Sequence, residues 1–273
     1  MRKERWYSKL YVWVVMLFLY APIFVLIAYS FNANKSRGKW TGFTLNWYTQ
    51  LFQNELIIRS LINTLLVALF ASVIATVLGT AAALGINGMK KRSRALVMNI
   101  TYMPIINPEI VTGVSLMLLF VSARTIYGEF ELGFFTLVLA HISFCTPYVI
   151  LNVLPKLRQM DRFIYEAALD LGCSPRLAFF KVVLPEIMPG ITAGFLMALT
   201  YSVDDFIISY FNSGSSFQTL PVTIYSMTRK RLSPEINALS TIIFAVILLI
   251  LLVVNLRGGR KERAATRKGG EVA

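Results

Sequence analysis

The chain has 273 residues, of which 56% are hydrophobic, and a formal net charge of +13. This hydrophobic content excludes a disordered chain, because disorder requires low hydrophobicity. Two cysteines are too few for a disulfide scaffold. A basic, soluble nucleic-acid-binding protein would explain the charge but not the mean hydropathy of +0.62, since soluble domains are about 45–50% apolar. The composition therefore indicates a membrane protein.

The apolar residues are gathered in six blocks, each close to the roughly 20 residues that a helix needs to cross a bilayer. The sequence therefore predicts an all-α polytopic membrane protein with six transmembrane helices, forming a single integral membrane domain over residues 1–273. We interpret the first block as a retained anchor, because it is longer than the roughly 7–15 apolar residues of a signal peptide. The blocks cover about residues 11–31, 61–86, 98–121, 133–154, 187–211 and 236–256.

Basic residues are distributed unequally between the two sides of these blocks. The two terminal tails, the second-to-third loop and the fourth-to-fifth loop together hold more than twice as many Lys and Arg residues as the other side. Because an excess of Lys and Arg marks the cytoplasmic side, we expect both termini in the cytoplasm. Every basic cluster adjoins an apolar block, which favours topology signals and lipid contacts over nucleic-acid binding.

The fourth-to-fifth loop, about residues 155–186, has the pattern of two short helices. Asp161 is suited to cap the first helix, and Gly172 suits the left-handed position that ends it. Ser174 and Pro175 are typical of the N-cap and first position of a second helix. A short amphipathic helix of this kind lies either in the lipid interface or in a groove on another protein.

The same loop contains a spaced motif. Glu166-Ala167-Ala168 is followed after three residues by Gly172, and Val182 and Leu184-Pro185 complete the pattern. It resembles the EAA loop of ABC-importer permeases, EAA-x3-G-x9-I-x-LP, with valine in place of isoleucine. The resemblance implies a type I ABC-importer permease whose short helix couples to a cytoplasmic ATPase dimer, and the small side chains favour close docking. The ATPase-coupling residues it implies are Glu166, Ala167, Ala168, Asp170, Gly172, Leu184 and Pro185.

Further stretches resemble the permease subunits of spermidine/putrescine importers. The resemblance implies uptake of a polyamine from an extracytoplasmic binding protein, together with a second permease subunit of different sequence, in the bacterial inner membrane. Permeases for other small organic cations or for ferric iron share parts of the pattern, so these substrates stay open, as does an ion-coupled secondary transporter. The stretches are Gly42–Tyr48, Ser60–Leu65, Asn107–Ile110, Ser202–Phe206, Leu220–Met227 and Ser233–Ala238.

The sequence has no G-x-x-x-x-G-K-[ST] phosphate-binding loop. We therefore expect this chain to bind no cofactor and not to be an enzyme, with ATP and Mg on a separate ATPase. We also expect no metal site, because His141 is the only histidine and the two cysteines lack metal-ligand spacing.

Three carboxylates, Glu109, Asp204 and Asp205, fall inside the apolar blocks. A charge at bilayer depth costs at least about 2.5–3.5 kcal/mol, so such residues are functional candidates. Carboxylates and aromatic faces suit the ammonium groups of a polyamine. The alternative is that these acids bind backbone or hydroxyl groups inside the bundle.

On an unbroken fifth helix, Asp205 shares a face with Ser202 and Ser209, which slightly favours Asp205 over Asp204 for the transport cavity. The predicted substrate-pathway residues are Asp204, Asp205, Glu109, Ser202 and Trp47, with Tyr201 and Tyr210 as further aromatic candidates.

Overall fold

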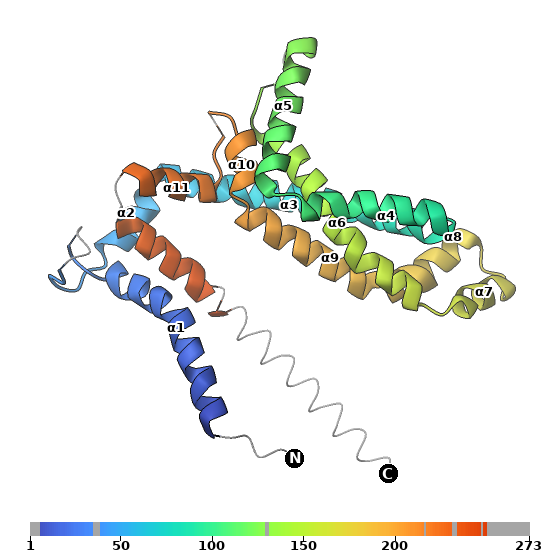
Figure 1. Ribbon diagram of the computed structural model, residues 1–273, viewed down its shortest axis with the longest axis horizontal. Coiled ribbons are helices and arrows are strands. Elements are labelled where there is room, and N and C mark those ends of the chain that lie inside the picture. The colour runs from blue at the N-terminus through green and yellow to red at the C-terminus, as the bar shows by residue number, and fades with distance from the viewer. Residues whose placement is uncertain are drawn as a thin grey trace. The chain divides into compact units, whose positions relative to one another are not determined.

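A computed structural model describes residues 6–34, 39–128, 131–215, 217–230, 234–246 and 248–249. These residues form helices joined by short loops (Figure 1), and the only strand-like pairing among them is an isolated bridge between Asn32 and Phe43. The all-α expectation is therefore confirmed. The end of the expected sixth span and the basic C-terminal tail lie outside the described residues.

The helices follow one another in the order shown in Figure 1. They are α1 (Trp6–Ser30), α2 (Asn46–Gln53), α3 (Glu55–Gly88), α4 (Lys91–Ile106), α5 (Glu109–Tyr127), α6 (Phe134–Gln159), α7 (Arg162–Asp170), α8 (Pro175–Ala178), the π-helical turn η1 (Phe179–Val183), α9 (Leu184–Asp204), α10 (Ile207–Asn212) and α11 (Leu220–Lys230).

Within the described residues, five helical segments are long and apolar enough to cross a membrane. A shorter apolar helix, Pro234–Val246, falls in the expected sixth block. The five segments are Lys9–Ser30, Glu55–Gly88, Glu109–Ile126, Phe134–Gln159 and Pro175–Asp204.

Two of the expected spans are not continuous helices. The block 98–121 is divided between α4 and α5, because Pro108 disfavours the helical conformation of the residue before it, and Asn107 is extended with ψ 139°. The block 187–211 is divided between α9 and α10, where Asp205 is extended with φ −64° and ψ 123°. Figure 1 shows α5 turned steeply away from the direction of α4.

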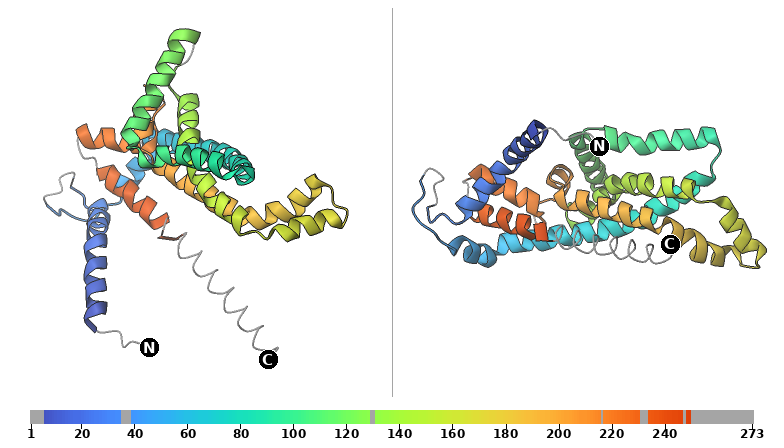
Figure 2. Two further views of the ribbon diagram at one scale, coloured as in Figure 1. Left: turned by 45° about the vertical axis from the view of Figure 1, so that its right-hand side comes forward. Right: turned by 90° about the horizontal axis from the view of Figure 1, so that it is seen from below.

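The chain divides into two compact units, Met1–Glu55 with Ser226–Ala273, and Leu56–Tyr225. In the second unit α6 and α9 lie side by side, as Figure 1 and both views of Figure 2 show. The buried core of this unit is formed mainly by α3, α6 and α9, with further side chains from α5, α10 and η1.

Glycines let α9 approach α6 closely. A Cβ atom on Gly190 would lie 2.8 Å from the Asn152 carbonyl oxygen, and one on Gly194 would lie 3.1 Å from the Cα of Val149. Both obstructing atoms belong to the backbone and cannot rotate away. Small residues at such positions are typical of helix pairs in membranes, where van der Waals packing drives association.

We therefore predict that Gly190→Ala destabilises the protein by about 1–3 kcal/mol, because overpacking forces backbone shifts. The matched control is Gly85→Ala in α3, whose Cβ would meet no atom within 4 Å. The control should be neutral or more stable by up to about 1 kcal/mol, since alanine favours helix. Unfolding of the purified protein in detergent measures both, and equal stability of the two variants would contradict the prediction.

Candidate functional site

Asp205 lies at the break between α9 and α10 and is 8% exposed. One carboxylate oxygen accepts a hydrogen bond from the amide of Ile208 at 3.2 Å, and the other accepts from the amide of Ser209 at 2.7 Å. These amides belong to the first turn of α10, where backbone N–H groups have no partner within the helix. The carboxylate therefore caps α10, and this capping allows the chain to stop one helix and start another.

His141 of α6 completes a buried network around this break. Its Nδ1 lies 2.6 Å from the hydroxyl of Ser202 on α9, and its Nε2 lies 3.2 Å from the hydroxyl of Ser209 on α10. Nε2 also lies 3.4 Å from an oxygen of Asp205. The sequence interpretation of His141 as a polar contact inside the bundle agrees with this arrangement.

Asp204, the last residue of α9, is exposed, in contrast to its buried neighbour. It follows Tyr201 by three residues, a spacing that places two side chains on one face of a helix about 5–6 Å apart. The ring of Tyr201 packs against that of Tyr148 from α6 in a tilted arrangement, with centroids 4.4 Å apart and planes inclined by 33°. An acid and two aromatic faces therefore lie together where α9 ends.

Glu109 is a second carboxylate in the neighbourhood of Tyr148. It is the first residue of α5, directly after the break at Pro108, and it is exposed. It lies close enough to Tyr148 to interact with it electrostatically. We call Glu109, Tyr148, Tyr201 and Asp204 the acid–aromatic cluster. Carboxylates beside ring faces attract organic cations, by charge and by contact with the π system.

The other two aromatic candidates make contacts of a different kind. Trp47 belongs to the unit that contains α1 and α2, is buried, and donates from its indole nitrogen to the carbonyl of Asn32 at 2.7 Å. Tyr210 of α10 packs with Phe206 and Tyr225, at ring centroid distances of 5.5 and 6.0 Å. Tyr148 is the member of the cluster that sequence reasoning missed.

The loop between α6 and α9 has the local structure that the sequence predicts. Asp161 accepts a hydrogen bond from the amide of Phe163 at 3.0 Å and so caps α7. Gly172 has φ +84°, and the amides of Gly172 and Cys173 donate to the carbonyls of Leu169 and Ala168, which closes the helix in a Schellman arrangement. Ser174 and Pro175 are the N-cap and first residue of α8.

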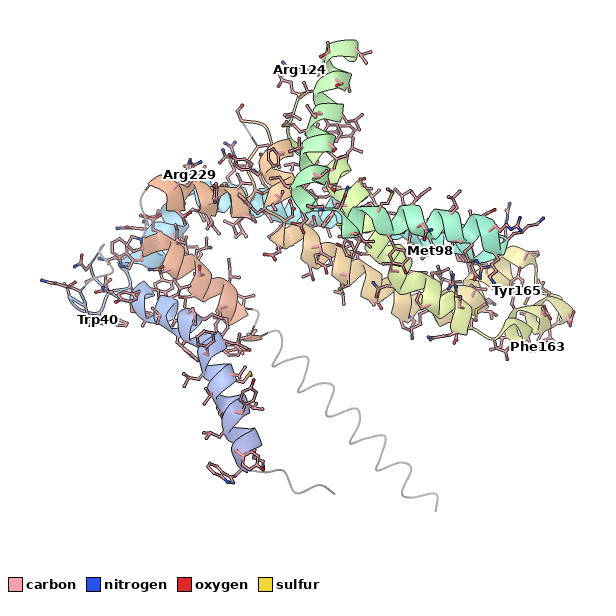
Figure 3. The ribbon with its side chains drawn as sticks, in the orientation of Figure 1. Trp40, Met98, Arg124, Phe163, Tyr165 and Arg229 are labelled. Atoms are coloured by element: carbon pink, nitrogen blue, oxygen red, sulfur yellow. The ribbon has the colours of Figure 1, made fainter. Side chains whose placement is uncertain are left out.

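Helix α7 exposes apolar side chains. Phe163 is 75% exposed and Leu171 is 86% exposed, and Figure 3 labels Phe163 and Tyr165 on this helix. Tyr165 packs partly against the core. Among the described residues, the face that carries Phe163 and Leu171 is therefore left uncovered. Glu166, Ala167 and Asp170 are also exposed, and Ala168 is half-buried.

The two remaining motif residues, Leu184 and Pro185, form the first turn of α9. The π-helical turn η1 joins α8 to α9, so one helical segment of 30 residues runs from Pro175 to Asp204. A continuous helix thus connects the end of the α7 loop to the acid–aromatic cluster. No group of three or more His, Cys, Asp or Glu side chains suited to a metal ion occurs among the described residues.

These features define a polytopic helical membrane protein with a cluster of carboxylates and aromatic rings and a protruding short-helix loop. Residues 75–258 match the family of the binding-protein-dependent transport system inner membrane component. The chain is 36% identical over 244 residues to the spermidine/putrescine transport system permease protein PotC of Haemophilus influenzae, covering 89% of this chain and 92% of that protein. It is 41% identical over 233 residues to the putrescine transport system permease protein PotI of Escherichia coli, covering 84% and 83%.

Among solved structures, a bacterial ABC transporter involved in the import of alginate matches with a TM-score of 0.67 and 13% identity, over 94% of this chain and 96% of that chain. An amino acid ABC transporter matches with a TM-score of 0.53 and 22% identity, over 78% and 99%. The chain therefore belongs to the family of binding-protein-dependent inner membrane transport components, and the resemblance of its sequence to ABC-importer permeases is confirmed. It is a transporter permease subunit.

The left-handed turn at Gly172 gives a prediction for the loop. A Cβ at this position would meet no atom within 4 Å, so only backbone conformation limits substitution. Gly172→Val should destabilise the end of α7 by about 1–2 kcal/mol, because valine is strained at positive φ. Hydrogen exchange of the amides in α7 should become faster. Gly172→Asn is the control, since asparagine tolerates this conformation, and equal exchange in the two variants would refute the explanation.

Proposed function

We propose that this chain is the transmembrane permease subunit of an ATP-driven importer that takes up polyamines, spermidine or putrescine, from a binding protein by alternating access. The observation that carries the proposal is the acid–aromatic cluster, in a chain 36% and 41% identical to two permeases of polyamine transport systems. Two carboxylates and two ring faces supply both kinds of contact that a chain of ammonium groups requires.

In this proposal the whole chain, 1–273, is one permease domain with six spans in the bacterial inner membrane. The helix Pro234–Val246 is the beginning of the sixth span. Both termini are cytoplasmic, which the excess of Lys and Arg on that side supports.

The α7 loop docks on a cytoplasmic ATPase dimer, which holds ATP and Mg. The exposed Phe163 and Leu171 and the sharp turn at Gly172 support this proposal, because an amphipathic helix with an uncovered apolar face suits a groove on a partner. A second permease subunit, of different sequence, completes the transport path, and an extracytoplasmic binding protein delivers the polyamine. The contacts to the ATPase come from Glu166, Ala167, Ala168, Asp170 and Gly172, with Leu184 and Pro185 joining the loop to α9.

The carboxylates of Glu109 and Asp204 face the polyamine in transit. Asp205 and Ser202 act on the path indirectly, since they hold the break beside Asp204. Trp47 acts by fixing the connection between α1 and α2. The helical segment from Pro175 to Asp204 carries movement of the loop toward the cluster when the ATPase closes.

Another small organic cation or ferric iron is the alternative substrate, and an ion-coupled secondary transporter is the alternative class. The aromatic rings of Tyr148 and Tyr201 favour an organic ammonium ion. Excess spermidine and putrescine should suppress uptake of the labelled substrate; uptake that is unaffected by both would indicate one of the alternatives.

Removing the two exposed charges tests the transit site. The double variant Glu109→Gln/Asp204→Asn, assembled with its partners, should raise the KM for spermidine uptake by about tenfold or more, which is the effect of losing about 1.4 kcal/mol of attraction. Glu55→Gln, which removes one exposed carboxylate outside the cluster, is the control and should leave the KM unchanged. An unchanged KM in the double variant would exclude a transit site at these acids.

A charge on the exposed face of α7 tests docking to the ATPase. Leu171→Asp should reduce the amount of co-purified ATPase by about tenfold or more, because a charge buried in an interface without a partner costs several kcal/mol. Leu45→Asp, at a leucine 54% exposed, is the matched control and should keep the ATPase bound. The docking proposal fails if both variants retain the ATPase equally.

A further inference from the structure

His141 is a fully buried polar side chain at the helix break. It is 1% exposed, and both of its ring nitrogens face polar groups on other helices. Nδ1 contacts Ser202 on α9, whereas Nε2 contacts Ser209 and Asp205 around the start of α10. One imidazole on α6 therefore connects the two halves of the broken helix.

Both ring nitrogens of the imidazole have polar partners. Nε2 lies 3.2 Å from the hydroxyl of Ser209 and 3.4 Å from a carboxylate oxygen of Asp205. Nδ1 lies 2.6 Å from the hydroxyl of Ser202, a group that can donate or accept. One imidazole thus contacts α9 through Nδ1 and α10 through Nε2 at the same time.

Each helix tied to His141 also carries or supports a member of the acid–aromatic cluster. Tyr148 follows His141 on α6 by seven residues, which is about two helical turns and the same face. Tyr201 is the residue before Ser202 on α9.

Glu109 is reached through α10. The side-chain amide of Asn212, on α10, donates to the carbonyl of Gly113 on α5 at 3.1 Å. Gly113 lies one turn after Glu109 on α5. The position of α10 therefore fixes the beginning of α5, and with it the second carboxylate of the cluster.

From this geometry we infer that His141 is a positioning residue for the cation-transit site: by joining α6, α9 and α10 it holds the carboxylates and the tyrosine rings of the acid–aromatic cluster in register. It does not touch the substrate. The inference rests on the proposed polyamine function and assigns His141 a role within it.

Kinetics of the assembled importer test this role. His141→Leu should raise the KM for spermidine by about tenfold or more while the maximal rate changes little, because small misplacements of binding groups have large effects. His141→Gln, whose amide can still donate toward Asp205, should recover part of the loss. The inference would be overturned if the KM of His141→Leu stayed within twofold of the original value. It would also be overturned if the maximal rate fell by about tenfold while the KM did not change.

A milder variant covers the case in which His141→Leu does not assemble. Ser202→Ala removes only the bond to Nδ1 and should raise the KM by a smaller factor. Ser72→Ala is its matched control, since this buried hydroxyl bonds only to the carbonyl of Leu69 in its own helix, and its KM should not change. Equal KM values in the two serine variants would contradict the role of the network.

A readout without substrate separates this inference from the proposed function. In the purified complex the amides of Ile208 and Ser209 should exchange hydrogen faster in Ser202→Ala and His141→Gln than in Ser72→Ala, because the cap of α10 loosens. Unchanged exchange would refute the positioning role even if polyamine uptake is established. Faster exchange in a complex that transports no polyamine would instead support the role of His141 in positioning the helices and would contradict the proposal that the substrate is a polyamine.

Discussion

The requirement that every backbone polar group inside a bilayer find a partner within the protein governs this structure. A helix that starts anew within an apolar block leaves the amides of its first turn without partners in the helix. In the fifth apolar block α9 ends at Asp204 and α10 starts at Ile207. The carboxylate of Asp205 meets this requirement by accepting from the amides of Ile208 and Ser209. Asp205 is therefore a buried residue with a structural role as the cap of α10. The adjacent Asp204 does not take part in the cap and is exposed.

The same break sets the end of the long helix that begins after the α7 loop. From Pro175 to Asp204 the backbone is continuously helical, with η1 as one widened turn. This helical segment begins directly after the α7 loop, and the acid–aromatic cluster lies where it ends. Helix α10 is fastened separately, through Asn212 to α5 and through the hydroxyl of Thr136, which donates to the Asn212 carbonyl. The transport path in our account therefore changes at the junction between these elements rather than along α9.

Local patterns in the sequence were sufficient to predict the helix caps and the turn, which depend on local interactions. The caps at Asp161 and Ser174 and the left-handed turn at Gly172 depend on a few neighbouring residues, and all three are confirmed. The apolar blocks located the helices but not the breaks at Pro108 and Asp205, because hydrophobicity does not report where backbone bonding is interrupted. The pairing of Tyr148 with Tyr201 joins residues 53 positions apart on two helices and depends on how α6 packs on α9, which no single-sequence pattern contains. The slight preference for Asp205 over Asp204 assumed an unbroken helix, and the break removes that assumption.

The central claim is that this permease subunit conducts polyamines in a machine driven by ATP. The most direct test is uptake of labelled spermidine into proteoliposomes that contain the assembled importer, with the binding protein outside and ATP or a non-hydrolysable analogue on the ATPase side. The account predicts saturable uptake with ATP, no uptake with the analogue, and suppression by unlabelled putrescine. Uptake that persists with the analogue, or that is driven by an ion gradient alone, would contradict it.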